Sequence, residues 1–420
     1  MGAAERILII GAGQAGGRAA EALRAGGYAG AITLVGDENE PPYERPALSK
    51  SVLLGEASPA STYLHPAEFW RARQVEWVAG VRAEAIAPAL RRVLLSDGSQ
   101  LDYSELILAT GSRVRPMVGV DDTLQGVHYL RTLGDCSRLA KELVAGCRLV
   151  VIGGGFIGLE VASSAAKRGL SVSVLERQPA LLERALPAEI AAAIERLQRA
   201  HGVDVRLGAA VAALNGTSEN PRKVASVALA DGSELAADLV VIGIGIIPNT
   251  ELAEAAGAAS ADGVVTDEYG RSTLEGLWAA GDVSSHYNPI LGRRVRLESW
   301  QNAQNQAISV AKNLMGARVP YAEVPWFWSD QHGVNIQMVG LAEPGATTVW
   351  RGDPAAGKAI AFSVLEGRIV CATAFNAGAD IRFARKLIEA RAAVGAAALA
   401  DGGRKLKDLA AQSTAAAVAA

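Results

Sequence analysis

The sequence predicts an α/β protein in which one strand–turn–helix–strand unit occurs twice, followed by a third, strand-rich region. A short apolar strand, a glycine turn and an alanine-rich helix run from Arg6 to Ala25, and the same pattern returns from Arg148 to Arg168. From about Tyr321 the composition changes to clustered tryptophans, several β-like runs and a final helix. The 420 residues, half of them apolar, suggest two to four packed domains.

Each copy carries the glycine spacing of a dinucleotide-binding βαβ unit. Strand 6–10 leads into GAGQAG and strand 148–152 into GGGFIG. A second strand follows in each copy and ends near an acid, which is Asp37 or Glu38 in the first copy and Glu176 in the second. The first glycine permits the tight turn, the second lets the backbone approach a pyrophosphate, and the third lets helix and strand pack closely. Free N–H groups at the helix N-terminus then face the phosphates.

The doubled pattern predicts two Rossmann-type domains. The candidate contacts are Gly11, Gly13, Ala15 and Gly16 in the first copy, and Gly153, Gly155, Phe156, Ile157 and Gly158 in the second. Three further strands end in glycine turns, in LILATGS (106–112), LVVIGIGIIPN (239–249) and LWAAGDVS (277–284). The C-terminal region shows β-like runs at 335–339, 347–350, 359–364 and 369–375, then a helix over about 379–391 with apolar residues at helical spacing. It is expected to form an α+β domain.

Composition excludes several classes of function. A net charge of −3 and a pI near 6.1 argue against nucleic-acid binding. No apolar run reaches the ~18 residues of a membrane span. The three cysteines are far apart, which fits neither a disulfide framework nor a metal site. The first strand begins almost at Met1, which leaves no room for a signal peptide, so a cytoplasmic protein is expected.

The order of motifs resembles one family closely. GAGQAG, PPYERPALSK (41–50), LILATG, GGGFIGLE (153–160), GIGIIPN, AAGDV and VPWFWSDQ (324–331) occur in sequence along nearly the whole chain. They are similar to the ferredoxin reductases that serve bacterial cytochromes P450 and Rieske-type oxygenases. PYERPALSK and PWFWSDQ are the specific segments, because many flavoproteins share the Rossmann glycines.

The resemblance implies a glutathione-reductase-like fold and an enzyme that passes electrons from NADH through FAD to a [2Fe–2S] ferredoxin, and so indirectly to an oxygenase. It implies an FAD domain over 1–113 and 246–319, an NAD domain over 114–245 and a C-terminal domain over 320–420. Hydride transfer between cofactors needs alignment and electrostatics rather than a protein nucleophile, which fits the absence of a Ser/His/Asp or Cys/His constellation.

The resemblance also assigns roles to individual residues. Lys50 beside the flavin and its partner Glu160 are the expected catalytic pair, and Glu176 is expected to bind the NAD ribose. The remaining FAD contacts that it implies are Asp37 on the ribose, Arg45 on the pyrophosphate, Asp282 on the ribitol, and Ala83, Thr110, Gly111, Arg131 and Trp300. Gly245 is expected on the NAD side, as is Glu160.

Some features separate this chain from relatives of the same fold and leave alternatives open. Disulfide reductases and NADH peroxidases need cysteine near 46–53, where this chain reads PALSKSVL. Rubredoxin reductase, apoptosis-factor-like oxidoreductases and a flavin-bound interaction protein with little turnover remain alternatives. Glu176 predicts NADH as donor over NADPH, although Arg177 could soften that preference. Candidate cations for docking an acidic ferredoxin are Arg293, Arg294, Arg296, Arg404, Lys405 and Lys407.

Overall fold

The chain divides into two compact units in the computed structural model, which describes residues 5–419. The first unit contains Met1–Arg45, Pro59–Arg113 and Ile246–Pro325. The second contains Pro46–Ser58, Val114–Gly245 and Trp326–Ala420. The short segment 46–58 therefore belongs to the second unit, whereas the residues directly before and after it belong to the first. The three-domain division expected from the sequence stays a prediction.

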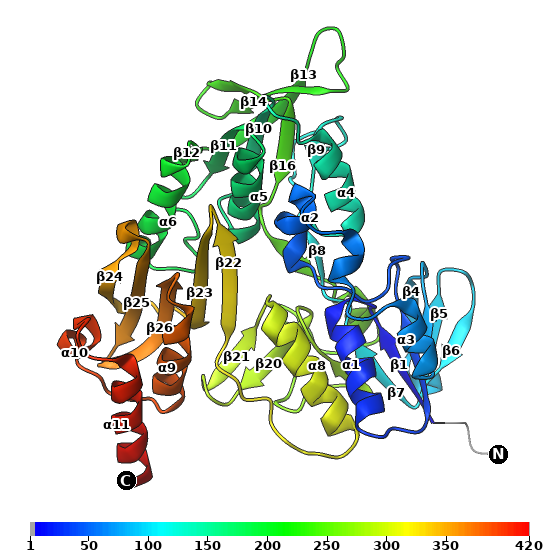
Figure 1. The fold of residues 1–420 in the computed structure, drawn as a ribbon. Coiled ribbons are helices and arrows are strands. Elements are labelled where there is room, and N and C mark those ends of the chain that lie inside the picture. The colour runs from blue at the N-terminus through cyan, green and yellow to red at the C-terminus, as the bar shows by residue number, and fades with distance from the viewer. Residues whose placement is uncertain (1–4, 420) are drawn as a thin grey trace. The chain divides into compact units, whose positions relative to one another are not determined.

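The first unit is built on a five-stranded parallel sheet in the order β19-β7-β1-β2-β3. Its strands are β1 (Arg6–Ile10), β2 (Ala31–Val35), β3 (Val75–Val78), β7 (Glu105–Leu108) and β19 (Leu277–Ala279). Successive residues of a strand face opposite sides. Accordingly, Ile7 and Ile9 enter one buried cluster, whereas Leu8 and Ile10 enter another. Helices α1 (Gln14–Ala25) and α8 (Trp300–Leu314) pack side by side against the first of these faces (Figure 1).

Smaller elements complete the first unit. Two three-stranded sheets have the orders β4-β5-β6 and β18-β20-β21. Their strands are β4 (Ala83–Ala87), β5 (Arg92–Leu95), β6 (Gln100–Asp102), β18 (Val264–Thr266), β20 (Ser284–Asn288) and β21 (Arg293–Arg296). The short helices are α3 (Ala67–Ala72) and α7 (Glu251–Ala255), and strands β8 (Ser112–Val114) and β17 (Ile246–Pro248) pair at the places where the chain changes unit.

The second unit begins with a parallel sheet of the same kind, in the order β12-β11-β10-β16-β9. Its strands are β9 (Val127–His128), β10 (Arg148–Ile152), β11 (Ser171–Glu176), β12 (Asp204–Leu207) and β16 (Leu239–Ile242). Its helices are α2 (Ser51–Leu54), α4 (Leu133–Glu142), α5 (Phe156–Lys167) and α6 (Ala188–Ala200). A small antiparallel sheet is formed by β13 (Val211–Gly216), β14 (Val224–Leu229) and β15 (Glu234–Ala236).

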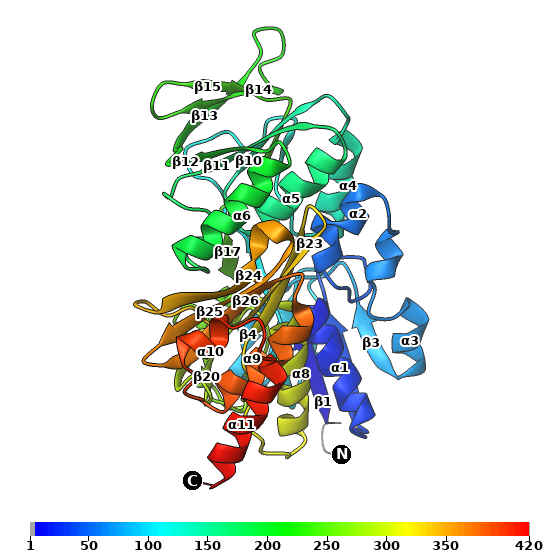
Figure 2. The same cartoon turned by 60° about the vertical axis from the view of Figure 1, so that its left-hand side comes forward.

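The C-terminal part of the second unit is an antiparallel sheet covered by helices, as the strand-rich pattern predicts. Its order is β22-β23-β26-β25-β24. The strands are β22 (Trp326–Gln331), β23 (Val334–Gly340), β24 (Thr347–Asp353), β25 (Lys358–Leu365) and β26 (Arg368–Phe375). Helix α9 (Gly378–Glu389) packs on β23 and β26, α10 (Ala396–Ala400) on β24, and α11 (Leu406–Ala419) on α9 (Figure 2).

The two parallel sheets have the same register, which refines the sequence comparison. Ile10 pairs with Val35 in the first sheet, and Ile152 pairs with Leu175 in the second. Glu176 therefore corresponds in register to Gly36. The candidate acids of the first copy, Asp37 and Glu38, lie one and two residues beyond that position. The sequence suggests helices that start near Gly17 and Leu159, but both fingerprint helices begin three residues earlier, at Gln14 and Phe156. Among the described residues, no helix is both long and apolar enough to span a membrane.

Candidate functional site

The fingerprint glycines form two matching turns that only glycine can make. Gly11 and Gly153 both have φ of +109°, and a Cβ on either would lie within 2.3 Å of a backbone carbonyl oxygen of the neighbouring strand end. A Cβ on Gly16 would lie 1.8 Å from the carbonyl oxygen of Gly11, and one on Gly158 would lie 2.3 Å from that of Gly153. Backbone atoms of the protein therefore leave no room for a side chain at these four positions, as the turn and packing roles require.

The middle glycines behave differently. A Cβ on Gly13 or on Gly155 would meet no atom within 4 Å. Each glycine stands immediately before its helix, with extended backbone, and no side chain caps either helix. Each turn therefore leaves open space beside backbone N–H groups at a helix N-terminus, which is the arrangement that accepts a pyrophosphate. The residues present fit one dinucleotide at each turn.

The first turns of the two helices carry the other predicted fingerprint residues. Ala15 is buried, and a Cβ on Gly281 would lie 3.0 Å from the Ala15 methyl. Phe156 packs on Phe327 of β22, with ring centroids 4.6 Å apart. Ile157 is 46% exposed, which is unusual for a large apolar side chain at the start of a buried helix.

The Glu176 carboxylate faces the second fingerprint. Oε2 accepts a 2.8 Å hydrogen bond from the Gly154 N–H, and Oε1 accepts one of 2.8 Å from the Gln178 N–H. A Cβ on Gly154 would lie 3.1 Å from Oε2, so the absence of a side chain there lets the acid approach. Each carboxylate oxygen offers two acceptor positions, so one on each remains for a ligand hydroxyl. Arg177 is exposed.

The two candidate acids of the first copy have different partners. Glu38 accepts hydrogen bonds from Arg45 Nη2 at 2.8 Å and from the Tyr43 hydroxyl at 2.7 Å. Arg45 also donates to the Tyr43 hydroxyl at 2.7 Å, which closes the triangle. The Asp37 side chain is 60% exposed, and its contact with Arg82 is 3.5 Å long. Glu38 is therefore committed to positioning Arg45, whereas Asp37 faces solvent.

Lys50 and Glu160 form the predicted ion pair. Lys50 Nζ lies 3.0 Å from Glu160 Oε1, 3.8 Å from Asp330 Oδ2 and 5.4 Å from the centroid of a Trp328 ring. The Glu160 side chain is 2% exposed. Burial raises the pKa of the Glu160 carboxyl, while Lys50 and the Ser329 and Ser49 hydroxyls oppose that rise. Segment 46–58, α5 and β22 thus converge on one buried carboxylate.

Sequence reasoning missed the hydroxyl groups that complete this pair. Ser49 Oγ donates to Glu160 Oε2 at 2.5 Å, and Ser329 Oγ donates to Oε1 at 2.6 Å. Ser164 Oγ in turn donates to the Ser49 carbonyl oxygen at 2.7 Å. Ser49 and Ser329 stand inside PALSK and PWFWSDQ, the two most specific motifs, which was the available signal.

The other predicted site residues are distributed over both units. In the first unit, Asp282 accepts a hydrogen bond from Ser112 Oγ at 2.9 Å, and Thr110 Oγ1 donates to the Asn249 carbonyl oxygen at 2.8 Å. Gly111, Ala83 at the start of β4 and Trp300 at the start of α8 belong to the same unit. In the second unit, Arg131 precedes α4, and Gly245 has φ of +109°.

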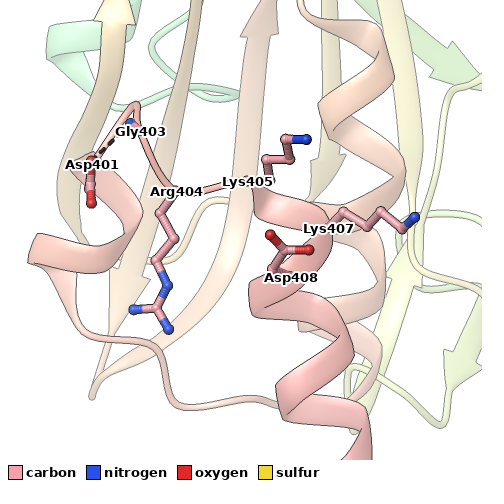
Figure 3. A pocket seen from close by; sticks show the side chains of 6 residues that line it. All are labelled: Asp401, Gly403, Arg404, Lys405, Lys407 and Asp408. Atoms are coloured by element: carbon pink, nitrogen blue, oxygen red, sulfur yellow. Dashed lines mark hydrogen bonds between the residues drawn. The ribbon is translucent and has the colours of Figure 1, made fainter.

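The predicted docking cations also differ in their surroundings. Arg294 donates to the Thr266 carbonyl oxygen at 2.7 Å, and Arg296 contacts both Asp262 at 2.9 Å and Glu298 at 2.5 Å. Both arginines thus have partners within the first unit, and the docking role of the sequence-based set stays a prediction. Figure 3 shows Arg404, Lys405 and Lys407 projecting around the turn between α10 and α11, where they line a hollow with Asp401, Gly403 and Asp408. We call these three cations the C-terminal basic cluster.

The cysteines and the possible metal ligands can be checked among the described residues. Cys136, Cys147 and Cys371 are free thiols. Burial raises the pKa of Cys136 to about 11 and that of Cys371 to about 12, so neither forms a reactive thiolate near neutral pH. No group of three or more His, Cys, Asp or Glu side chains suited to a metal ion occurs in the part of the chain that the structure describes.

Comparison with known proteins agrees with this arrangement. Residues 5–307 match the family model of the pyridine nucleotide-disulphide oxidoreductases, and residues 326–410 match that of the reductase C-terminal domain. The ferredoxin–NAD(+) reductase component of the anthranilate 1,2-dioxygenase system of Burkholderia cepacia is 44% identical over 95% of this chain and 97% of its own. Putidaredoxin reductase of Pseudomonas putida is 38% identical over 97% of both chains.

Solved structures give the same result. The crystal structure of a covalent putidaredoxin reductase–putidaredoxin complex matches with a TM-score of 0.93 and 38% identity, over 98% of this chain and 99% of that one.

Proposed function

Because the chain belongs to the pyridine nucleotide-disulphide oxidoreductase family, we propose that it is an FAD-dependent NADH:ferredoxin oxidoreductase. In this proposal it passes electrons from NADH to a [2Fe–2S] ferredoxin, which feeds a cytochrome P450 or a Rieske-type oxygenase. One relative is named as the ferredoxin–NAD(+) reductase component of a dioxygenase system and another as putidaredoxin reductase, and the likeness covers nearly the full length of both chains. The observation that carries the proposal is the pair of open fingerprint turns, combined with a buried Lys50–Glu160 pair and no cysteine pair.

We assign FAD to the first fingerprint and the nicotinamide cofactor to the second. In the first unit, the N–H groups beside Gly13 would hold the FAD pyrophosphate, with Arg45 as the nearby cation that Glu38 and Tyr43 position. Asp37 would accept the ribose hydroxyls, since its carboxylate faces solvent. When bound, FAD supplies hydride acceptance and one-electron release, which no protein side chain provides.

In the second unit, Gly155 and Glu176 define the nicotinamide cofactor site. The open turn at Gly155 would take the pyrophosphate, and the remaining acceptor position on each Glu176 oxygen would take one ribose hydroxyl. A 2′-phosphate would bring negative charge against this carboxylate and remove one hydroxyl donor. This geometry supports NADH as the donor.

Lys50 and Glu160 would act as a charge-positioning pair. The ammonium group of Lys50 sits between two carboxylates and the Trp328 ring, so it is held as a cation at one place. Were the cofactor rings bound beside this ammonium group, its fixed positive charge would favour the negative charge that a reduced flavin carries. Glu160 keeps Lys50 there, and the two serine hydroxyls oppose the rise in the pKa of Glu160 that burial causes. Removing one partner of a buried pair leaves an uncompensated charge or forces a change of protonation.

The proposal places the enzyme in the cytoplasm, where thiols remain reduced, in keeping with its three free cysteines. The acceptor would approach the exposed cations of the C-terminal basic cluster, although Asp401 and Asp408 beside them lower the net positive charge of that surface.

The test begins with the purified protein, which should be yellow and release FAD on denaturation. Anaerobic mixing with NADH should bleach the flavin absorbance within seconds. Protein that holds flavin but is not reduced by NADH within minutes would indicate an interaction protein. Colourless protein that takes up no added FAD would contradict the cofactor assignment itself.

A further inference from the structure

A chain of buried hydrogen bonds leads away from Glu160 through side chains of β22 and α6. Ser329 Oγ, which donates to Glu160, accepts a 3.0 Å hydrogen bond from Gln331 Nε2. Gln331 Oε1 accepts a 2.9 Å bond from Gln198 Nε2. Gln198 Oε1 lies 2.9 Å from His332 Nε2. Ser329, Gln331 and Gln198 are fully buried, so water does not compete for these groups.

The direction of the chain is fixed by one backbone group. Gln198 Nε2 also donates to the carbonyl oxygen of Leu159 at 3.3 Å, and a carbonyl can only accept. The amide nitrogen of Gln198 must therefore lie on that side, and its oxygen must face His332. Gln331 then has to present its oxygen to Gln198 and its nitrogen to Ser329. The Ser329 hydroxyl hydrogen is left for Glu160.

Every donor in the chain consequently points toward the carboxylate. His332 donates to Gln198, Gln198 to Gln331, Gln331 to Ser329, and Ser329 to Glu160. Aligned hydrogen bonds polarise one another, so each strengthens the next in a low-dielectric interior. A protonated Glu160 would lose the benefit of this alignment, because its oxygen would accept more weakly.

We propose that Ser329, Gln331 and Gln198 are positioning residues that hold Glu160 ionised and thereby hold Lys50 in place. The functional part of this inference rests on the proposed role of the Lys50–Glu160 pair. This chain of hydrogen bonds supplies oriented donors to a buried carboxylate, as water does to an exposed carboxylate. It extends from α5 through β22 to α6, so the ionisation of Glu160 depends on the packing of three separate elements.

The titratable groups around this chain are few. Lys50 faces Glu160 from the segment 46–58, and Asp330 faces Lys50 from β22. His332 stands at the far end, stacked on His201 with ring centroids 4.3 Å apart. Burial, with His201 adding to the effect, lowers the pKa of His332 to about 4, so this end stays neutral near pH 7. Lys50 is therefore the compensating charge, and the serine–glutamine chain supplies neutral donors.

The test measures the protonation of Glu160 directly in the FAD-loaded protein. Infrared difference spectra against Glu160→Gln isolate the carbonyl stretch of the protonated acid as pH is varied. Ser329→Ala should move this titration upward by about one pH unit or more, because a hydrogen bond to a charged group is lost. Gln331→Leu, which leaves Ser329 in place, should give a smaller upward shift through lost polarisation.

Ser163→Ala is the matched control. Ser163 Oγ accepts a 2.7 Å hydrogen bond from the backbone N–H of His332. The variant therefore loses one serine hydroxyl on α5, and every side-chain hydrogen bond between His332 and Glu160 is kept. It should leave the titration unchanged. An unshifted titration in Ser329→Ala, or an equal shift in Ser163→Ala, would overturn the proposal. An unshifted Gln331→Leu would show that Ser329 acts alone and that the chain has no role.

A second measurement relates this chain of hydrogen bonds to the rate of flavin reduction by NADH. In Ser329→Ala the acid limb of the pH profile for flavin reduction by NADH should move upward by the same amount as the infrared titration. A lower rate with no displacement of the limb would indicate simple misplacement of Lys50. Because the infrared titration uses no nicotinamide, failure of NADH to reduce the flavin would count against the proposed function and leave the assignment of the chain standing.

Discussion

Replacing Glu176 by alanine is expected to abolish discrimination between NADH and NADPH. Both carboxylate oxygens already accept one backbone N–H each, which fixes their orientation and leaves one acceptor position per oxygen. A hydrogen bond to a charged group contributes roughly 1.5–3 kcal/mol, and about 1.4 kcal/mol is a factor of ten. The native enzyme should therefore prefer NADH by roughly ten- to a hundredfold in kcat/KM.

Steady-state kcat/KM with each donor measures this directly. Glu176→Ala should lose at least about tenfold with NADH and bring the ratio of the two donors close to one. Arg177→Ala is the matched control on the neighbouring residue, whose side chain is exposed. It should leave NADH unaffected and lower activity with NADPH, since a guanidinium can pair with a 2′-phosphate. Equal use of both donors by the native enzyme would refute the reasoning and make Arg177 the decisive residue.

Three other outcomes follow from the structure. Lys50→Met should slow reduction of the flavin by NADH more than it weakens FAD binding, and an unchanged stopped-flow rate would show that the pair with Glu160 is structural only. Burial, with Arg294 adding to the effect, lowers the pKa of His286 to about 4 from an unfolded value near 6.5. The neutral ring therefore stabilises the folded state fully above about pH 6.5, and this stabilisation decreases as the pH falls toward 4. In His286→Phe, the free energy of unfolding should fall by up to roughly 3 kcal/mol less on acidification than in the native protein. An equal loss of thermal stability in the native protein and the variant between pH 7 and 4.5 would contradict this prediction. Ferredoxin reduction should fall steeply with salt while reduction of a neutral dye changes little, and neutralising the C-terminal basic cluster should flatten the first curve only; parallel curves would argue against electrostatic docking.

Local patterns made most of the fold predictable. The duplicated strand–glycine–helix unit indicated both parallel sheets, because a tight turn and close helix packing require glycines at a fixed spacing. Gly11 and Gly16 in one copy, and Gly153 and Gly158 in the other, are closed against backbone atoms as that spacing requires. The strand-rich C-terminus was recognisable from its β-like runs, and helix α9 from the spacing of its apolar residues, whereas α10 and α11 were not predicted.

Long-range pairing was harder to predict. Nothing local in PYERPALSK says that the chain changes unit after Arg45, so that Lys50 packs with α5 while Arg45 remains with Glu38. Ser329 and Gln198 are ordinary polar residues in sequence, and only their fully buried positions reveal a shared network. The Lys50–Glu160 pair was predictable through resemblance to a family, whereas the groups that stabilise it required coordinates.

The central claim is that electrons from NADH leave the flavin for a [2Fe–2S] ferredoxin. The protein is first reduced anaerobically with one equivalent of NADH and is then mixed in a stopped-flow instrument with oxidised [2Fe–2S] ferredoxin or, separately, with rubredoxin. A two-electron-reduced flavin gives one electron to each [2Fe–2S] cluster, so we predict that two equivalents of ferredoxin are bleached for each oxidised flavin that returns, and that rubredoxin reacts far more slowly. A flavin that stays reduced beside ferredoxin, or that gives its electrons preferentially to rubredoxin, would contradict the account.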